Sequence, residues 1–306
     1  MTLRYPEFRG MMPIMPTTVT PDGDVDLGAQ QRIVDYLLDC GAVAIGHMGG
    51  ASEYYKVAEE DRGPIIQTVV ERVAKRVPVF VGVTAMSVKQ TLKNAREAYA
   101  LGADLLMVCS PVNGTMKKGD LLKFYEAVAA ETPLPIIVQD TGASSGAYSA
   151  EFMAELAEKI PTVGYAKAEG GGFLRKTVDL QRLTDGAIQV IGGAGGSHML
   201  ALLRQNVKAF MTGTEALDLH GAVVSAYLAG DVDKATDLYY TKVLPYLVIY
   251  NTNSRHLLKY MLMKRGVLES DDTLFPYDTA PTDPLMLAEL DLVLDRIQND
   301  TIALRG

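Results

Sequence analysis

The chain has 306 residues, of which 48% are hydrophobic and 22% charged, enough for a sizeable core in one large α/β domain or two smaller ones. Its formal net charge of −8 argues against nucleic acids and anionic membranes as partners, although a locally positive pocket can still bind a small anion. Cys40 and Cys109 form no CxxC motif, so we expect neither a disulfide framework nor a structural zinc site. The first ten residues lack a signal-peptide apolar segment, and no apolar run is long enough to span a membrane. We therefore expect a cytoplasmic protein.

Eight short apolar runs follow one another along the chain, as is typical of parallel strands buried on both faces. They begin at 11 (MMPIMPT), 43 (VAIGHM), 78 (PVFVGV), 105 (LLMVCS), 135 (PIIVQD), 163 (VGYAKA), 188 (IQVIGG) and 209 (AFMTG). Amphipathic helical patterns separate them. The first four patterns are marked by Ile33, Val34, Leu37 and Leu38, by Ile65, Ile66, Val69 and Val70, by Val88, Leu92, Ala95 and Tyr99, and by Leu121, Phe124, Tyr125 and Val128. Alternating strands and helices predict a (β/α)₈ TIM barrel over residues 1–225, with a doubly wound sheet as the competing fold.

The remaining residues, 226–306, carry mainly helical patterns. The segments are DVDKATDLYYTKVLPYLVIY, SRHLLKYMLMKRG and PLMLAELDLVLDRIQ, and a stretch with three prolines (271–284) separates the last two. We expect a C-terminal helical extension that packs on the barrel.

Catalytic groups of such a barrel lie at the carboxyl ends of the strands and in the loops that follow. This rule selects Thr17 and Thr18, the segment Gly49–Glu53, Asn113, Gln139 and Asp140, Lys167 and Glu169, and the glycine-rich segment 192–197.

Lys167 is the most informative of these residues, because lysine is rarely buried unless it is paired. A desolvated amine is more readily neutral, and a neutral amine can attack a ketone to form a Schiff base. Glu169 lies two residues further on and therefore on the same strand face. An ion pair between the two residues is the alternative interpretation of their spacing.

Two glycine-rich loops suggest binding functions. In GGASE, Gly49 and Gly50 allow backbone N–H groups to approach a ligand closely, which suits a substrate carboxylate; an ordinary strand–helix turn is the alternative. The segment GGAGGS follows the seventh strand, where barrels often bind phosphate, but it contains no lysine or arginine. It can instead form a flexible lip around the distal end of the substrate. The four histidines show no metal-binding spacing, and we expect no metal site.

With these residues in place, the chain resembles the dihydrodipicolinate synthase/N-acetylneuraminate lyase family from about Phe8 to Leu203. Lys167 matches that family's imine-forming lysine, and GGASEYYKVAEED matches its carboxylate-binding segment. The resemblance implies a homotetrameric (β/α)₈ barrel that binds a small 2-keto acid covalently and needs no cofactor beyond the lysine imine.

The departures from the family pattern point to one branch. The relay tyrosine after the fourth strand falls on Asn113, whose amide cannot titrate, and Ser144 replaces the arginine of dihydrodipicolinate synthases. The pairs Ser52–Glu53, Gln139–Asp140 and Lys167–Glu169 resemble the 2-keto-3-deoxyarabonate dehydratase-like branch, although that branch tends to carry a histidine where Asn113 stands.

We therefore expect a Schiff-base lyase that dehydrates a 2-keto-3-deoxy sugar acid. Its catalytic positions are Lys167 as nucleophile, Glu169 as first and Asp140 as second choice for proton transfer, and Asn113 in place of the relay tyrosine. Its expected substrate-binding residues are Gly50, Ala51, Ser52, Thr17, Gln139 and Gly193. The alternatives are a pyruvate-dependent aldolase or synthase and, from another class, a non-catalytic 2-keto-acid-binding protein.

Overall fold

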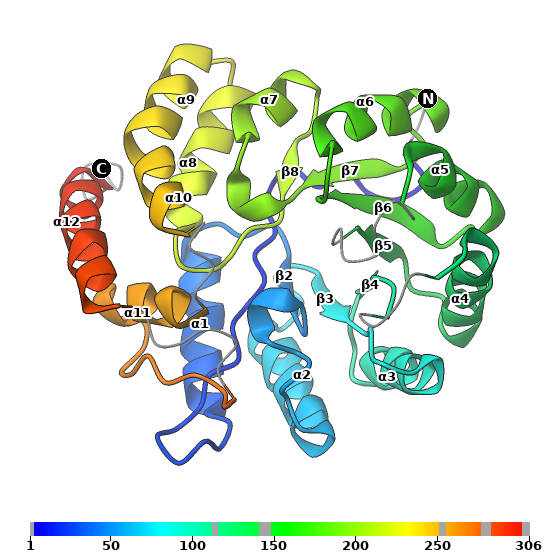
Figure 1. Ribbon diagram of the computed structural model, residues 1–306, viewed down its shortest axis with the longest axis horizontal. Helices are drawn as coiled ribbons and strands as arrows, with labels where there is room; N and C mark the ends of the chain where they lie inside the picture. Colours follow the sequence, from blue (N-terminus) through cyan, green and yellow to red (C-terminus); the bar gives the residue numbers. More distant parts are fainter. Residues whose placement is uncertain (1–2, 112–115, 141–147, 251–254, 277–282, 302–306) are drawn as a thin grey trace.

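The computed structural model describes residues 3–111, 116–140, 148–250, 255–276 and 283–301. Within these residues, eight parallel strands form one sheet in the order β1-β8-β7-β6-β5-β4-β3-β2 (Figure 1). They are β1 Gly10–Met11, β2 Ile45–His47, β3 Val79–Gly82, β4 Leu105–Val108, β5 Ile136–Gln139, β6 Val163–Ala168, β7 Gln189–Gly192 and β8 Ala209–Phe210. Each strand overlaps one of the eight apolar runs or lies directly against it, which confirms the predicted parallel barrel.

Backbone bonds between the first two strands close the sheet into a barrel. Ile14, just beyond β1, forms a parallel bridge with Gly46 of β2. Gly46 donates to the Pro13 carbonyl at 2.9 Å, and its own carbonyl accepts from the Met15 N–H at 2.8 Å. The position needs glycine, because a Cβ there would lie 2.1 Å from the Phe80 ring. β1 also pairs with β8, so the strands form a closed ring.

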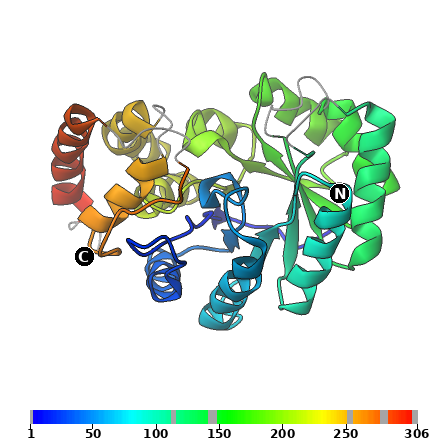
Figure 2. The ribbon, with the colours of Figure 1, turned by 60° about the horizontal axis from the view of Figure 1, so that its bottom comes forward.

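A helix follows each strand on the outside of the barrel (Figures 1 and 2). These helices are α1 Leu27–Asp39, α2 Glu59–Val73, α3 Val88–Ala100, α4 Lys118–Glu131, α5 Ala150–Lys159, α6 Phe173–Leu183, α7 Met199–Arg204 and α8 Leu217–Leu228. Asp26 caps the N-terminus of α1, because its carboxylate accepts the Ala29 N–H at 2.8 Å.

The buried face of α3 differs from the predicted one. The apolar pattern predicts Tyr99 on the core side, but this residue is 49% exposed, and Val88 is exposed as well. Two polar residues, Thr91 and Asn94, occupy the inner face instead. The Asn94 amide donates to the Val83 carbonyl at 3.2 Å, which satisfies a backbone group just after β3. The hydrophobic pattern failed here because side-chain hydrogen bonds to the barrel compensate the burial of polar residues.

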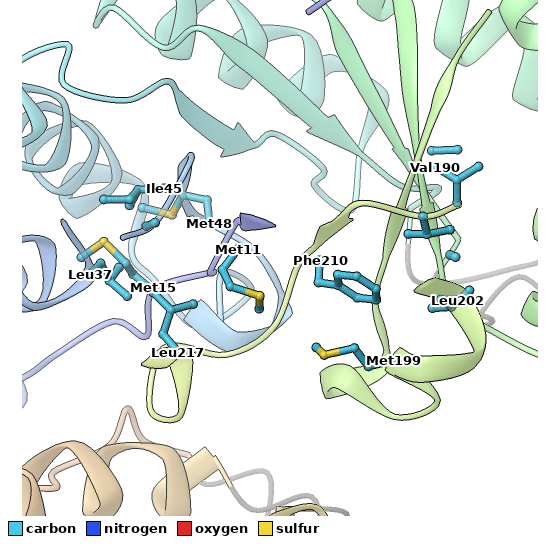
Figure 3. Packing of buried hydrophobic residues seen from close by; sticks show 14 of the residues in the cluster. Met11, Met15, Leu37, Ile45, Met48, Val190, Met199, Leu202, Phe210 and Leu217 are labelled. Carbon is cyan, nitrogen blue, oxygen red and sulfur yellow. The ribbon is translucent and has the colours of Figure 1, made fainter. Parts of the chain in front are cut away.

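Hydrophobic residues form one core inside the barrel and a second between the barrel and its helices. The inner core contains Phe8, Met12, Ile14, Ala44, Phe80, Leu105, Met107, Ile137, Tyr165, Ile191, Ala209 and Met211. In the outer core, Phe210 of β8 packs against Met199 and Leu202 of α7 (Figure 3). The separation follows from alternating side-chain directions along each strand.

The C-terminal extension lies on one side of the barrel, beside α8 (Figure 1). It comprises α9 Val232–Leu238, a π-helical turn Tyr239–Val243, α10 Leu244–Tyr250, α11 Arg255–Lys264 and α12 Pro284–Thr301. The predicted boundary after residue 225 falls within α8. Arg265, just after α11, ties the extension to the barrel by donating to Asp218 at 2.7 Å and to the Tyr36 hydroxyl at 2.9 Å.

Candidate active site

The alternation of side chains along β6 places Lys167 inside the barrel mouth. Tyr165 belongs to the inner core, whereas Ala166 and Ala168 pack in the outer core, so Lys167 shares the inward direction of Tyr165. Its Cα pairs with Gln139 on one side and with Ile191 on the other. The lysine side chain is 6% exposed, and it therefore needs a partner for its charge.

Glu169 supplies that partner, and its carboxylate meets three donors. Oε1 lies 2.9 Å from Lys167 Nζ and accepts from the Ala194 N–H at 3.3 Å. Oε2 accepts from the Gln139 side-chain amide at 3.1 Å. Gly193 makes room for this arrangement, because a Cβ there would lie 2.5 Å from Glu169 Cγ. Lys167, Glu169 and Gln139 thus form one connected group.

A cavity of about 340 Å³ lies over this group, within the usual size range of small-molecule sites. Its lining comes from the ends of several strands and from α10: Ile14, Gly50, Ala51, Gln139, Lys167, Glu169, Gly170, Ala194, Gly195, Met211, Thr212, Gly213 and Tyr250. A larger cavity of about 540 Å³ lies between the loops after β2 and β3, but its lining contains none of the predicted catalytic residues. We assign the site by its chemistry rather than by its size.

The turn after β2 brings Gly50 and Ala51 to the cavity that the lysine also lines. It begins at His47, whose Nδ1 accepts the Met48 N–H at 2.8 Å, and continues as the 3₁₀ turn Gly50–Ser52. Burial, reinforced by the nearby Arg62 charge, lowers the pKa of His47 to about 3, so the ring is neutral and Nδ1 can accept. Within the described part of the chain, the N–H groups of Gly50 and Ala51 donate to no protein acceptor.

Thr17 and Ser52 lie behind this turn rather than in the cavity lining, although the sequence placed both among the substrate contacts. The Ser52 hydroxyl donates to the Met15 carbonyl at 2.6 Å and accepts from the Gly49 N–H at 3.2 Å. The Thr17 hydroxyl donates to the Ser52 carbonyl at 2.6 Å. Both hydroxyls are fully buried and engaged, so their geometry suits support of the turn.

Asp140 also lies apart from the cavity. Because Gln139 points into the barrel, the next residue points outward, and the Asp140 carboxylate forms an ion pair with Lys176 of α6. Gly170, which lines the cavity, lies against this carboxylate, since a Cβ on Gly170 would lie 3.3 Å from Asp140 Oδ2. The structure thus pairs Glu169 with Lys167, and Asp140 with Lys176. Asn113 and Ser144 lie outside the described residues.

The glycine-rich loop after β7 contacts the C-terminal extension. A Cβ on Gly195 would lie 2.3 Å from the Tyr250 ring, so the absence of a side chain lets the tyrosine reach the cavity. Within the described lining of the cavity, Lys167 is the only cationic side chain. This composition favours a lip around the substrate over a phosphate site.

Comparison with known proteins now identifies the family. The sequence model of the Dihydrodipicolinate synthetase family matches residues 7–288 of the chain. The chain belongs to this family. L-2-keto-3-deoxyarabonate dehydratase of Azospirillum brasilense is 31% identical over 274 residues, which cover 87% of this chain and 87% of that protein. The 4-hydroxy-tetrahydrodipicolinate synthase of Acidothermus cellulolyticus is 28% identical over 270 residues, which cover 87% and 86% of the two chains.

Solved structures agree on the fold. YagE of Escherichia coli K12, a prophage protein of the dihydrodipicolinic acid synthase family solved in complex with pyruvate, has a TM-score of 0.87 at 23% sequence identity. The match covers 95% of this chain and 99% of that one. The sequence-based resemblance is thus confirmed. Dihydrodipicolinate synthetase family enzymes are lyases and aldolases that form a Schiff base with a lysine and use no metal or external cofactor.

Three features around this site were not found from the sequence. Tyr250 and the residues after β8, Met211 to Gly213, line the cavity, and Cys109 follows β4 beside Thr84. Burial raises the pKa of the Cys109 thiol, with Thr84 and Lys167 acting in the opposite direction. The run AFMTG indicated the residues after β8, because its last three residues stand at the carboxyl end of a predicted strand, but no motif pointed to Tyr250.

Two further findings concern the described residues only. No group of three or more His, Cys, Asp or Glu side chains is arranged to hold a metal ion. No helix there combines the length and apolarity that a membrane crossing requires.

Proposed function

We propose that the chain is a Schiff-base-forming lyase that dehydrates a 2-keto-3-deoxy sugar acid. The observation that carries the proposal is the 2.9 Å contact between Lys167 Nζ and Glu169 Oε1 in the cavity that Gly50 and Ala51 also line. A nucleophile, a proton carrier and free backbone donors are the three groups that imine-based elimination from a keto acid needs. The dehydratase relative from Azospirillum brasilense supports the choice of reaction.

Imine formation begins with the substrate carboxylate on the Gly50 and Ala51 N–H groups and the C2 ketone beside Lys167. Glu169 takes a proton from the Lys167 ammonium, and the resulting amine attacks C2. A proton moves from nitrogen to the former ketone oxygen, Glu169 returns its proton to that hydroxyl, and water leaves. The product is an iminium ion, and its positive charge withdraws electrons from C3.

Elimination then uses the same carboxylate twice. Glu169 removes a proton from C3, and the electron pair of that C–H bond forms the enamine. The enamine expels the C4 hydroxyl, which takes the proton from Glu169 and leaves as a second water molecule. Hydrolysis of the conjugated iminium releases the product and restores Lys167. The Gln139 amide and the Ala194 N–H orient the carboxylate throughout, because both donate to it.

Glu169 suits this role better than Asp140. Its side chain is 20% exposed and lines the cavity, whereas Asp140 forms an ion pair with Lys176 and is not part of the cavity lining. A carboxyl group that alternates between base and acid also removes the need for a relay tyrosine at position 113.

Two assays test the proposal. Incubation with pyruvate and borohydride, followed by mass spectrometry, should place the adduct on Lys167. Product analysis with 2-keto-3-deoxypentonates and -hexonates should show loss of water without release of pyruvate. An adduct on a different lysine contradicts the mechanism, and pyruvate release contradicts the dehydratase assignment.

A pyruvate-dependent aldolase is the second candidate function. The similarity to a 4-hydroxy-tetrahydrodipicolinate synthase favours it, and the imine on Lys167 would serve aldol cleavage as well as dehydration. It predicts pyruvate among the products. A non-catalytic keto-acid-binding protein predicts that pyruvate binds without a trappable imine.

We also propose that the protein assembles as a homotetramer, because members of the family are typically oligomeric. Sedimentation analysis at micromolar concentration tests this. A single species at the monomer mass of 33.1 kDa contradicts it.

A further inference from the structure

A buried ionic cluster joins the turn at Gly50–Ser52 to the C-terminal extension. Glu53, the residue directly after the turn, carries a carboxylate whose Oε1 lies 2.7 Å from Lys56 Nζ. Its Oε2 lies 3.8 Å from Nζ of Lys259, which belongs to α11. All three side chains are at most 6% exposed, so water contributes little to their stabilisation.

Glu53 is held in an unfavourable conformation. Its φ of +52° lies in the left-handed region, which a residue other than glycine occupies only when the surroundings enforce it. Its Oε2 accepts no hydrogen bond within the described residues. A buried carboxylate oxygen in this situation is costly, and the Lys259 ammonium is the cation that faces it. Without that cation, this orientation of the carboxylate is destabilised, and rotation of the Glu53 side chain would displace the adjoining turn.

Lys259 is itself fixed from the opposite side. It is 1% exposed, and its ammonium donates to the Asp272 carbonyl at 2.8 Å. Lys56 reaches the same segment through a 3.4 Å bond to the Leu274 carbonyl. Backbone carbonyls of the segment 272–274 therefore accept hydrogen bonds from both ammonium groups, and both ammonium groups face the Glu53 carboxylate. Burial lowers the pKa of Lys259 to about 8, so a charged lysine at this place costs stability.

We propose that Lys259 is a positioning residue of the carboxylate site: acting through Glu53, it fixes the turn Gly50–Ser52 in the shape that presents its N–H groups to the substrate. The inference rests on the proposed function for its substrate, but the shape of the turn can be measured without any substrate. The C-terminal extension thereby contributes to the binding site through Lys259 as well as through Tyr250, which lines the cavity.

The test compares Lys259→Met with the wild-type protein in two measurements. We expect the pyruvate concentration that gives half-maximal trapping on Lys167 to rise about tenfold, while the trapped fraction at saturation stays unchanged. In the protein without substrate, hydrogen exchange of the peptide covering Gly49–Glu53 should accelerate about tenfold. The bonds from Ser52 N–H to Gly49 and from Glu53 N–H to Gly50 protect it in the wild type. Unchanged exchange, or unchanged half-saturation, overturns the proposal.

Two further variants test whether the charge acts through Glu53. Lys259→Gln keeps a donor for the Asp272 carbonyl but removes the charge, so it should behave like Lys259→Met. If it behaves like the wild type, the hydrogen bond alone matters and the proposal fails. In a Glu53→Gln background, Lys259→Met should have little further effect, because residues that act through one another are not additive. A full additional effect also overturns the proposal.

Arg265→Met provides the matched control. Arg265 is another buried cation of the extension, but its side-chain hydrogen bonds go to Asp218 and Tyr36 rather than to the turn. It should leave half-saturation and exchange at Gly49–Glu53 unchanged, and an effect equal to that of Lys259→Met contradicts the specific role. If wild-type protein traps no pyruvate, the proposed function fails, whereas the exchange measurement still decides the positioning role.

Discussion

Replacement of Glu169 by glutamine is the most direct test of the proposed proton carrier. The amide has nearly the same shape as the carboxylate but acts neither as a general acid nor as a general base near neutral pH. We expect kcat to fall by about 10²–10⁴-fold, the usual contribution of general acid–base catalysis. At about 1.4 kcal/mol for each factor of ten, this corresponds to a loss of about 3–5 kcal/mol in transition-state stabilisation.

The contacts of Glu169 indicate that the variant will fold. Its three partners, the Lys167 ammonium, the Ala194 N–H and the Gln139 amide, are all donors in the wild type. The amide oxygen of the Glu169→Gln variant can serve the first two, and the Gln139 amide can turn over to accept from the new NH₂ group. Lys167 loses a charged partner, but the Glu169 side chain is 20% exposed. We therefore expect a destabilisation of about 1–2 kcal/mol, below the value for a fully buried pair.

The assay measures kcat on a 2-keto-3-deoxy acid over a range of pH, together with borohydride trapping of pyruvate. Trapping should persist in Glu169→Gln, because imine formation depends mainly on Lys167. Asp140→Asn is the matched control, since Asp140 pairs with Lys176 outside the cavity; its kcat should stay within a few-fold of wild type. If kcat of Glu169→Gln at its own optimum stays near wild type and only the pH dependence of trapping changes, Glu169 is a charge partner and our mechanism is wrong.

Three other substitutions give separable results. Lys167→Ala should abolish both turnover and trapping while circular dichroism and the melting temperature show an intact fold; residual trapping elsewhere on the protein speaks against the imine assignment. Gly50→Val should raise KM strongly with a smaller change in kcat, because a branched side chain blocks approach to the turn; an unchanged KM means that the carboxylate binds elsewhere. Ser52→Ala should lower the free energy of unfolding by about 1–3 kcal/mol, because Met15 and Gly49 lose a buried partner, and denaturant titration measures this.

The barrel and its reactive pair were accessible from the sequence because both depend on local periodicity. Buried parallel strands produce apolar runs at regular intervals, and the eight runs coincide with the eight strands. A period of two puts Lys167 and Glu169 on one strand face, and the structure has their charged groups 2.9 Å apart. The same rule, applied to neighbouring positions, separates Gln139 from Asp140, although both stand among the candidates selected from the sequence.

The parts that escaped prediction depend on contacts between distant segments. A hydroxyl such as that of Ser52 can bind a ligand or a nearby carbonyl, and only the fold around Met15 decides between them. Tyr250 reaches the cavity through the packing of α10 on Gly195, for which no motif exists. The burial of Lys259 was only weakly indicated: in RHLLKYMLMK this residue stands three positions before Leu262 and so on the same helix face, and Leu262 is buried.

The charge of Lys259 leads to a last prediction, in which stability and binding respond to pH in opposite directions. Burial lowers its pKa from the ordinary 10.5 to about 8; Glu53, Asp271 and Asp272 act against this shift and Lys56 reinforces it. Below pH 8 both folded and unfolded chains hold the proton. Between pH 8 and 10.5 the unfolded chain holds the proton and the folded chain does not, so folding releases one proton in this range.

The proton count makes the free energy of unfolding rise with pH in this window, relative to Lys259→Met, because the unfolded chain binds one proton more than the folded chain. The full difference is about 3–4 kcal/mol, from about 1.4 kcal/mol for each pH unit between about 8 and 10.5. Denaturant titrations of both proteins at pH 7, 8, 9 and 10 measure it. Half-saturation by pyruvate should worsen over the same range in the wild type relative to the variant, because the neutral amine no longer compensates the Glu53 carboxylate. If the stability difference does not depend on pH, Lys259 releases no proton on folding in this range. The buried charge behind the turn then does not lower the stability of the fold.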